Sequence, residues 1–137
     1  MNKPIRIIQT SNPGSGSTVL VNILMAFFQP YEGVTFMGKN YYKEDMISNN
    51  IVIKSHDKKI DDWIQNFGEK YELYFIISDR NDYDWQKYYD YDNILFIQYE
   101  ELLETDENPL NQISENLYNK IEKFLPLKFM VYNRKNI

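Results

Sequence analysis

Residues 9–20 read Gln9-Thr10-Ser11-Asn12-Pro13-Gly14-Ser15-Gly16-Ser17-Thr18-Val19-Leu20. A short apolar run, residues 5–8, precedes this stretch, and an amphipathic segment, residues 19–28, follows it. A strand that passes through a glycine-rich turn into a helix directs several backbone N–H groups at one point, where the helix dipole adds partial positive charge. The stretch therefore suits a phosphate or another oxyanion. The alternative is a Gly/Ser surface loop that joins two elements, and these residues alone do not separate the two interpretations.

The same turn lacks one part of a nucleotide-binding loop. Ser15, Ser17 and Thr18 supply hydroxyl donors, but no lysine follows the second glycine, Gly16. The Walker A pattern is therefore incomplete. A positively charged side chain for a bound anion has to come from elsewhere in the chain.

The composition limits the classes of function. At 137 residues the chain has the length of one domain with a sizeable core. Its formal net charge of −5 argues against broad nucleic-acid binding, which needs a basic face. Because the chain has no cysteine and a single histidine, thiolate catalysis, cysteine metal sites and histidine-rich zinc sites are excluded. No apolar run spans a bilayer and no apolar leader precedes the first strand, so we expect a cytoplasmic protein without a membrane partner.

Short apolar runs alternate with helical segments along the chain. The runs are rich in β-branched residues and bounded by turn residues, as buried parallel strands are. They are residues 5–9, 51–54, 73–77 and 94–97. The predicted helices are residues 17–28, 58–67, 83–89 and 109–124, and a loop with a short helix near residues 43–47 is expected between residues 31 and 50. This alternation predicts an α/β fold with a mostly parallel four- to five-stranded sheet.

Three polar stretches follow predicted strands. They are residues 12–18, 54–56 and 78–82. Ligands of parallel α/β sheets bind beyond the carboxyl ends of the strands, so all three stretches are expected at one edge of the sheet. This convergence favours an anion site over a plain surface loop.

Lys54 and His56 stand two residues apart at the end of a strand, so in an extended chain both side chains leave the same face. Beside a bound anion, the lysine can stabilise negative charge on a leaving oxygen while neutral imidazole accepts a proton. The plainer interpretation is a surface lysine and a histidine that caps the following helix, and the two residues alone favour it.

Four segments occur in an order that is typical of one family. They are Pro13-Gly14-Ser15-Gly16-Ser17-Thr18-Val19-Leu20, Ile53-Lys54-Ser55-His56, Arg80-Asn81-Asp82-Tyr83-Asp84 and Ile97-Gln98-Tyr99-Glu100-Glu101-Leu102. They resemble, in turn, the P-K-S-G-T-T-W-L loop for the 5′-phosphosulfate, the I-K-T-H strand end, the R-N-P-K-D start of the 3′-phosphate site and the V-x-Y-E-D-L structural marker of the sulfotransferase family. The family's fold is a variant of the P-loop nucleotide kinase fold. The resemblance therefore implies a P-loop-containing nucleotide hydrolase-like, three-layer α/β/α fold for a single sulfotransferase-like domain, residues 1–137.

The resemblance also implies an activity. A sulfotransferase moves the sulfuryl group of 3′-phosphoadenosine 5′-phosphosulfate (PAPS) to an acceptor hydroxyl or amine and leaves 3′-phosphoadenosine 5′-phosphate (PAP). On this reading His56 is the base, Lys54 bonds the bridging oxygen, and Arg80 pairs with the 3′-phosphate through its forked charge. No metal is needed, because positioning and fixed positive charge carry such a transfer. The residues implied for the 5′-phosphate are Ser15, Gly16, Ser17 and Thr18, and Asn12 and Gly14 are implied as further cofactor-binding residues of the same loop.

The chain departs from the family pattern around both phosphate sites. Gly14 stands where the family's loop has lysine or arginine, which leaves Lys54 to act alone. The serine that assists the 3′-phosphate is absent, and Tyr88 or Lys87 stands at its position. An alternative alignment places Ser78 at the arginine position and weakens the 3′-phosphate site.

The C-terminus and the length also differ from the family. Arg134 and Lys135 are at best a remnant of the R-K-G-x-x-G segment that covers the cofactor in the family. The chain is short, so the acceptor-binding insertions must be trimmed. This implies an open site, a homodimer partner that completes it, or a large exposed acceptor. The acceptor itself, whether a small molecule, a glycan or a peptide, is not specified by the sequence.

Two other functions remain open on sequence grounds. A divergent P-loop nucleotide kinase or NTP-binding protein is one, and the missing Walker lysine counts against it. A non-catalytic nucleotide-binding module of the same fold is the other, and Gly14 and the shortened C-terminus favour it. Among the remaining candidates, Trp63 is expected in the core, Trp85 either in the core or against adenine, and the acidic residues 79–92 on a solvated helix rather than at a metal.

Overall fold

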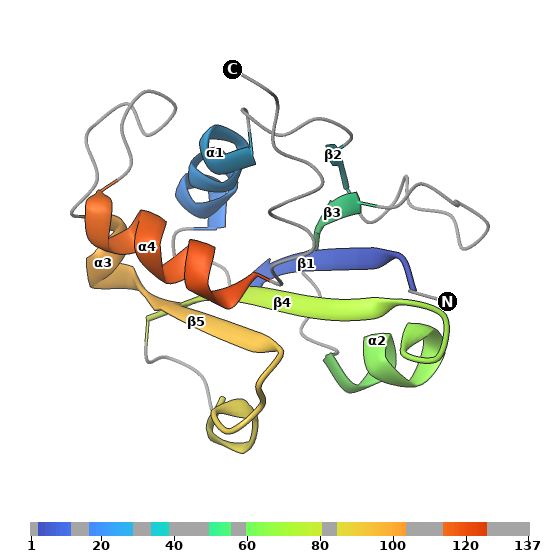
Figure 1. Ribbon diagram of the computed structural model, residues 1–137. Coiled ribbons are helices and arrows are strands. Elements are labelled where there is room, and N and C mark those ends of the chain that lie inside the picture. The colour runs from blue at the N-terminus through green and yellow to red at the C-terminus, as the bar shows by residue number, and fades with distance from the viewer. Residues whose placement is uncertain are drawn as a thin grey trace.

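The structure is a computed structural model, which describes residues 3–11, 17–28, 34–38, 50–55, 60–80, 85–103 and 114–125 (Figure 1). Five strands form one sheet, with helices on both of its faces. In chain order the elements are β1 (Ile5–Ser11), α1 (Ser17–Phe28), β2 (Val34–Gly38), β3 (Asn50–Lys54), α2 (Ile60–Phe67), β4 (Glu72–Asp79), η2 (Gln86–Tyr88), β5 (Ile94–Gln98), α3 (Tyr99–Leu103) and α4 (Glu115–Phe124).

The five strands lie in the order β2-β3-β1-β4-β5, and every neighbouring pair is parallel. In the centre of the sheet, Ile8 of β1 pairs with Ile53 of β3 on one side and with Phe75 of β4 on the other. Strands that are buried on both faces read as continuous apolar runs, and Ile8, Ile53 and Phe75 are each fully buried. The predicted α/β fold with a parallel sheet is confirmed.

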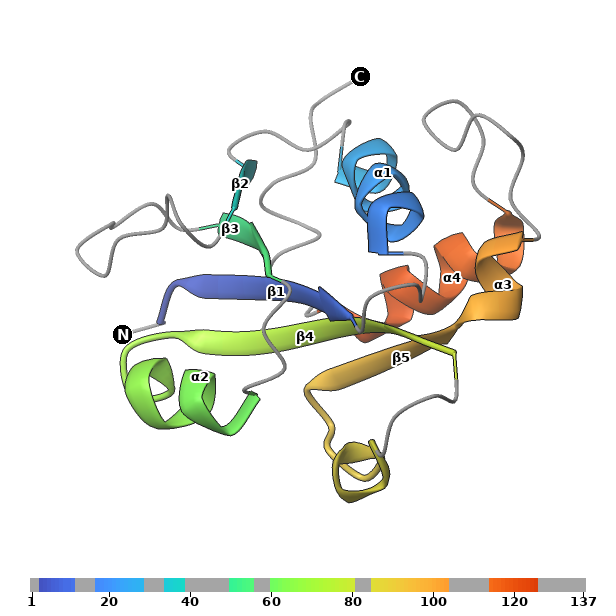
Figure 2. The same cartoon turned by 180° about the vertical axis from the view of Figure 1, so that it is seen from behind.

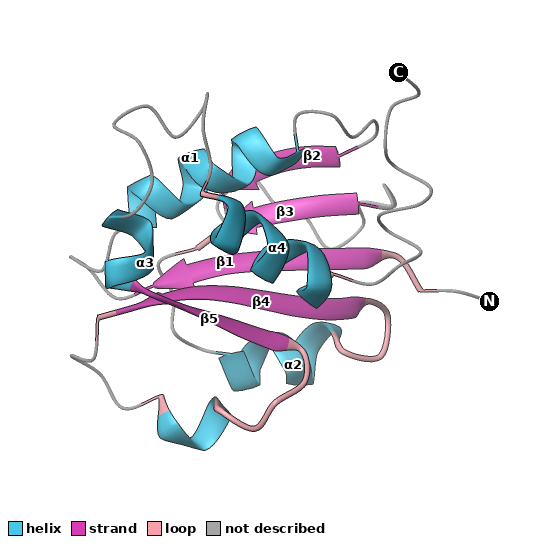
Figure 3. Cartoon of the chain, turned by 60° about the vertical axis from the view of Figure 1, so that its left-hand side comes forward, coloured by secondary structure: helices cyan, strands magenta, loops and turns pink. Residues whose placement is uncertain are grey.

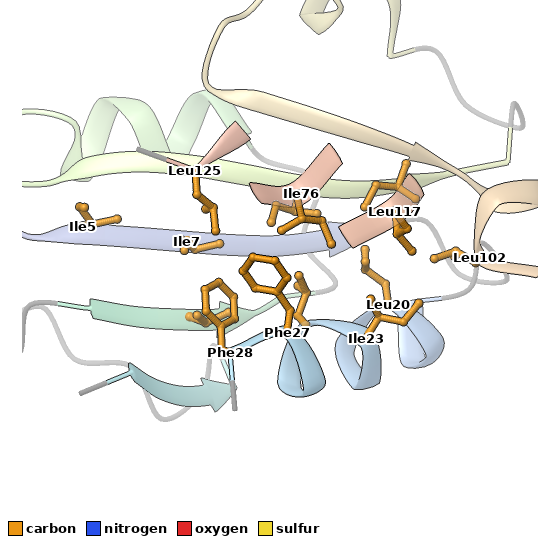
Figure 4. Packing of buried hydrophobic residues seen from close by; sticks show 14 residues of the cluster. Ile5, Ile7, Leu20, Ile23, Phe27, Phe28, Ile76, Leu102, Leu117 and Leu125 are labelled. Carbon is orange, nitrogen blue, oxygen red and sulfur yellow. The ribbon is translucent and has the colours of Figure 1, made fainter. Parts of the chain in front are cut away.

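One face of the sheet carries α1, α3 and α4 (Figure 3). The apolar side of α1 packs on β1, where Phe27 meets Phe28 edge-on at 5.0 Å and the ring of Tyr118 from α4 at 4.9 Å between centroids. Figure 4 shows the side chains of this first cluster filling the space between helices and sheet. The buried members are Ile5, Ile7, Leu20, Ile23, Leu24, Phe27, Phe28, Val52, Ile76, Ile97, Leu102, Leu117, Ile121 and Leu125.

The opposite face carries α2 and η2, as the view from behind in Figure 2 makes clear. This second cluster is rich in rings, and Trp63 stacks at a tilt on Phe67 with 5.2 Å between centroids. The prediction that Trp63 belongs to the core is confirmed, because only 6% of its surface is exposed. Helices on both faces make three layers, as expected. No helix in the described part of the chain has the length and apolar character needed to cross a membrane.

Three sequence predictions about elements are wrong. The stretch between residues 31 and 50 contains the edge strand β2 (Val34–Gly38), which was expected to be loop. In place of a helix over residues 83–89, the described part shows only the 3-10 turn η2 from Gln86 to Tyr88. The last helix begins at Glu115, after an extended Ser114, and not near Pro109. The helix expected near residues 43–47 and the tail 127–137 lie outside the described residues.

Candidate functional site

The strand order creates a switch point between β1 and β4. From β1 the chain leads through α1 to β2, on the far side of β3, whereas from β4 it leads through η2 to β5 on the other side. In open parallel sheets, ligands bind in the crevice that opens beyond the carboxyl ends of two strands whose connections diverge in this way. Ser11 of β1 pairs with Ser78 of β4 at this point. The candidate site therefore lies beyond the Ser11–Ser78 pair.

Lys54 is the last residue of β3, a neighbour of β1, and it lies on the face of the sheet that carries α1. Lys54 pairs with Gln9 of β1. Two residues earlier in the same two strands, Ile7 pairs with Val52, and both of these residues belong to the first cluster. Because side chains alternate along a strand, Gln9 and Lys54 point to the same face as that cluster. Lys54 is half-buried, and its side chain forms no hydrogen bond or ion pair with any residue that the structure describes.

The amino terminus of α1 reaches this edge of the sheet. The helix begins at Ser17, six positions after the last residue of β1, and Figure 2 shows its first turn beside the carboxyl end of that strand. The helix start predicted at Ser17 or Thr18 is confirmed, and Thr18 is exposed. The first backbone N–H groups of a helix have no partners within it, so this end favours an anion.

Arg80 follows the last residue of β4 and is exposed. Its guanidinium carbon lies 4.3 Å from the centroid of the Tyr99 ring, and Tyr99 is the first residue of α3. The preceding residue, Asp79, is fully buried, and its Oδ2 accepts a hydrogen bond from the Tyr89 hydroxyl at 3.2 Å. The Asp79 side chain therefore points to the face of the sheet that carries α2, and the Arg80 side chain contacts α3 on the other face.

The structure does not bring Tyr88 to this edge. Its side chain is 5% exposed within the second cluster, and its hydroxyl donates to Oδ2 of Asp61 on α2 at 3.1 Å. Burial is the largest of the influences that raise the pKa of Tyr88. Lys87, the other residue at the position of the family's serine, also donates to Asp61, at 3.2 Å. Both residues bond to Asp61 in the first turn of α2, on the face of the sheet opposite the one to which Lys54 points.

Trp85 does not offer a stacking surface for a base. Only 3% of its surface is exposed, and its ring packs at a tilt against Tyr88 and Phe96 with 6.1 and 6.0 Å between centroids. Its Nε1 is buried without a hydrogen-bond partner among the described residues. Of the two interpretations that the sequence allowed for Trp85, the structure supports the core.

Several predicted residues lie outside the described part of the chain. They are Asn12, Gly14, Ser15, Gly16, His56, Arg134 and Lys135. Ser17 is placed at the start of α1, but its side chain is not described. Of the predicted set, Lys54, Thr18 and Arg80 are therefore the members whose side chains are placed at the carboxyl edge.

Known proteins do not identify the chain. No protein-family model, curated protein or solved structure matches it. A function is therefore inferred from the residues at the switch point.

Two residues at this edge were not foreseen in these roles. The resemblance implies only a structural marker at Tyr99, yet its ring lies against Arg80. The sequence predicts Asp79 in a solvated acidic helix, yet it is fully buried at the end of β4. The one signal for Asp79 in the sequence is its place two residues after the apolar run of residues 73–77, because the end of such a strand is still inside the protein. Among the described residues, no three metal-ligating side chains lie together.

Proposed function

We propose that the chain is a PAPS-dependent sulfotransferase with a P-loop-containing nucleotide hydrolase-like fold. The observation that carries the proposal is Lys54, a half-buried lysine beside the switch point with no partner among the described residues. The ammonium group of Lys54 is a compact positive charge with three donors, so it can bind an anion at this edge. The ordered motifs around Lys54 indicate which anion this is.

The described residues fit the two anionic ends of PAPS. The amino terminus of α1 suits the 5′-phosphate, because its N–H groups and dipole favour negative charge. Arg80 suits the 3′-phosphate, because its planar fork of donors matches phosphate oxygens. Lys54 ends β3 and Arg80 directly follows β4, and these strands are the two neighbours of β1. Positive charge is thereby supplied on both sides of the strand that leads into the glycine-rich turn.

The proposed reaction is a single displacement at sulfur. His56 accepts the proton of the acceptor hydroxyl or amine, whose oxygen or nitrogen forms the new bond to sulfur. The bond between sulfur and the bridging oxygen breaks, and that oxygen leaves with its electron pair as part of PAP. Lys54 stabilises the charge that develops on the bridging oxygen. The acceptor is a small molecule, glycan or peptide, and no metal takes part.

Ligand binding tests the nucleotide assignment. Thermal unfolding is measured with PAP, ATP, GTP and S-adenosylmethionine, each with and without Mg²⁺. We expect PAP alone to stabilise the protein, independently of Mg²⁺; a ligand at 100 times its dissociation constant adds about 2.7 kcal/mol. Stabilisation by ATP or GTP that requires Mg²⁺ would instead support a nucleotide kinase. No effect of PAP at millimolar concentration would overturn the proposal.

Turnover tests the catalytic assignment. Release of PAP from PAPS is followed with 4-nitrophenol or a tyrosine peptide as acceptor. We expect Lys54→Ala and His56→Ala each to slow release by about 10²-fold. The matched control is Lys123→Ala, an exposed lysine in the last turn of α4. PAP binding without turnover would assign the chain to the non-catalytic module, for which Gly14 in place of the family's loop cation is the favouring feature.

A further inference from the structure

Strand β5 is the last strand on one side of the sheet. In the order β2-β3-β1-β4-β5 it pairs with β4, and no strand in the described part of the chain pairs with its other side (Figure 3). The N–H and C=O groups along such an edge are a template on which a further strand can form. The outer edge of β5 can therefore accept one more extended chain.

The polar backbone groups on this outer edge belong to alternate residues. The N–H of Phe75 in β4 donates to the carbonyl of Asn93 at 2.8 Å, so the polar groups of Asn93 point toward β4. Both polar groups of a residue point to the same side, and the side alternates along a strand, so Leu95 and Ile97 also bond toward β4. The residues whose polar groups point outward are Ile94, Phe96 and Gln98.

The sequence of β5 does not protect this edge. Natural edge strands avoid further pairing by means of charged side chains, proline or a bulge. β5 reads Ile94-Leu95-Phe96-Ile97-Gln98, without charge or proline, and its register with β4 continues through all five residues without a bulge. Leu95 and Phe96 are half-buried, so each leaves apolar surface at the edge. The edge therefore favours an uncharged, apolar strand.

A second copy of β5 has the required pattern of backbone groups. Phe96 lies midway between Ile94 and Gln98, so an antiparallel two-fold pairing can be centred on it. Phe96 then lies opposite Phe96 of the second copy, and Ile94 lies opposite Gln98 of the second copy. Opposite residues of this kind exchange their backbone hydrogen bonds, so the pairing uses all three outward-facing residues. The Ile94 N–H also donates to the Tyr91 carbonyl, but that bond is long, at 3.4 Å.

The side chains of two such strands are also compatible. Phe96 faces its counterpart on one face, and Leu95 lies opposite Ile97 of the second copy on the other, and apolar cross-strand pairs of this kind are stabilising. Because β5 carries no charge, the paired strands oppose no like charges. The Phe96 ring packs against Trp85 and Tyr89, with 6.0 and 4.9 Å between centroids, so its place is already set before pairing.

We infer that two copies of the chain form an antiparallel, two-fold dimer through the outer edges of β5. A second copy is the partner because it always supplies the strand that matches this edge. The two-fold axis places the carboxyl edges of the two sheets at opposite ends, so neither copy completes the switch point of the other. The inference does not depend on the proposed function, since it uses none of the residues proposed to bind PAPS.

Sedimentation equilibrium of the full chain tests for the dimer. The chain has a mass of 16.5 kDa, and we expect the measured mass to rise toward twice this value as the protein concentration increases. Gln98→Pro removes an outward N–H from each copy and keeps the bonds to β4, since proline is tolerated where the N–H faces away from a sheet. We expect it to weaken the dimer by about tenfold. Gln98→Thr keeps the N–H, and as the matched control it associates like the natural chain.

Amide hydrogen exchange locates the interface without a substitution, so the test remains decisive if circular dichroism shows that Gln98→Pro does not fold. The N–H groups of Phe96 and Gln98 are expected to exchange freely in the monomer and to become protected as the dimer forms. The N–H groups of Leu95 and Ile97, which bond toward β4, are expected to be protected at every concentration.

Three results would overturn the inference. A monomer at every concentration would exclude the dimer. A dimer in which Phe96 and Gln98 exchange freely would place the interface on another surface. Protection of both N–H groups in a monomer would show that a segment of the same chain covers the edge of β5.

Discussion

The backbone N–H of Leu117 donates to the side-chain oxygen of Ser114 at 3.2 Å. Ser114 has an extended backbone, with φ −58° and ψ 143°, and immediately precedes α4. It is therefore the N-cap of that helix, which satisfies one of the N–H groups that the first turn leaves unpaired. This contact sets the start of α4 at Glu115, six residues after Pro109, near which the sequence pattern predicts a beginning.

The cap predicts a specific loss of stability. Ser114→Ala removes the acceptor and is expected to lower the free energy of unfolding by about 1 kcal/mol. Ser114→Asp supplies an equivalent acceptor and a negative charge at the helix start, so it is expected to retain the stability. Urea unfolding of both variants measures the difference. Equal stability of the alanine and aspartate variants would show that the cap does not contribute.

The strands of the core could be predicted from the sequence for a physical reason. β1 and β4 are buried on both faces, so each contains a short apolar stretch, residues 7–8 in β1 and 73–77 in β4, although β1 also buries Arg6, Gln9 and Thr10. β2 is short, lies at the edge of the sheet and ends at Gly38. From the sequence, the run Val34-Thr35-Phe36-Met37 is expected in a loop, because Gly33 and Gly38 stand on its two sides. Edge strands depend on pairing with a neighbour, here β3, which a local pattern does not contain.

The sequence predicts which strand ends form the candidate site. The position of Lys54 at the carboxyl edge follows from the end of an apolar run and from the rule for parallel sheets. The contact between Arg80 and Tyr99 does not follow, because it joins residues 19 positions apart, from the ends of two different strands. The side of the sheet to which each of Asp79 and Arg80 points depends on packing against α2 and α3. Local residue patterns carry no information on that choice.

Gly68 is expected to tolerate no side chain. It follows α2, and its N–H donates to the Ile64 carbonyl at 2.9 Å. A Cβ at this position would lie 2.5 Å from the same carbonyl oxygen, which is backbone and cannot move away cheaply. Gly68→Ala is therefore expected to cost about 1–3 kcal/mol of unfolding free energy, as overpacking does. The neighbouring exposed Glu69→Ala is the matched control, and an equal effect of the two changes in thermal unfolding would contradict the steric explanation.

Ionisation of Tyr74 is expected to lower the free energy of unfolding at alkaline pH. Burial, and then the negative charge and hydrogen bond of Glu72, raise the pKa of Tyr74 to about 12 from an ordinary 10.0. Its hydroxyl donates to Glu72 Oε1 at 3.2 Å. Because the folded state favours the neutral phenol, its contribution is complete below pH 10 and is lost as the pH rises toward 12.

The measurement for Tyr74 compares the natural chain with Tyr74→Phe. Phenylalanine keeps the ring that meets Phe124 edge-on at 5.8 Å but has no proton to lose. Above pH 10, stability is expected to fall more steeply in the natural chain than in the variant, as followed by urea unfolding. Identical slopes would show that the Tyr74 phenol has the same pKa in the folded and unfolded states.

Asp79 is expected to weaken the binding of anions at the switch point. It is fully buried and directly precedes Arg80, so its negative charge opposes that of a bound phosphate through a poorly screened interior. Asp79→Asn keeps an acceptor for the Tyr89 hydroxyl and removes the charge. PAP binding is therefore expected to tighten, by about two- to fivefold for 0.5–1 kcal/mol of removed repulsion. Tyr89→Phe, which removes only the hydrogen bond, and Asp90→Asn, an exposed aspartate beyond η2, are the controls in the same calorimetric titration. Unchanged or weaker PAP binding by a folded Asp79→Asn variant would show that the buried carboxylate supports the site and does not oppose its ligand.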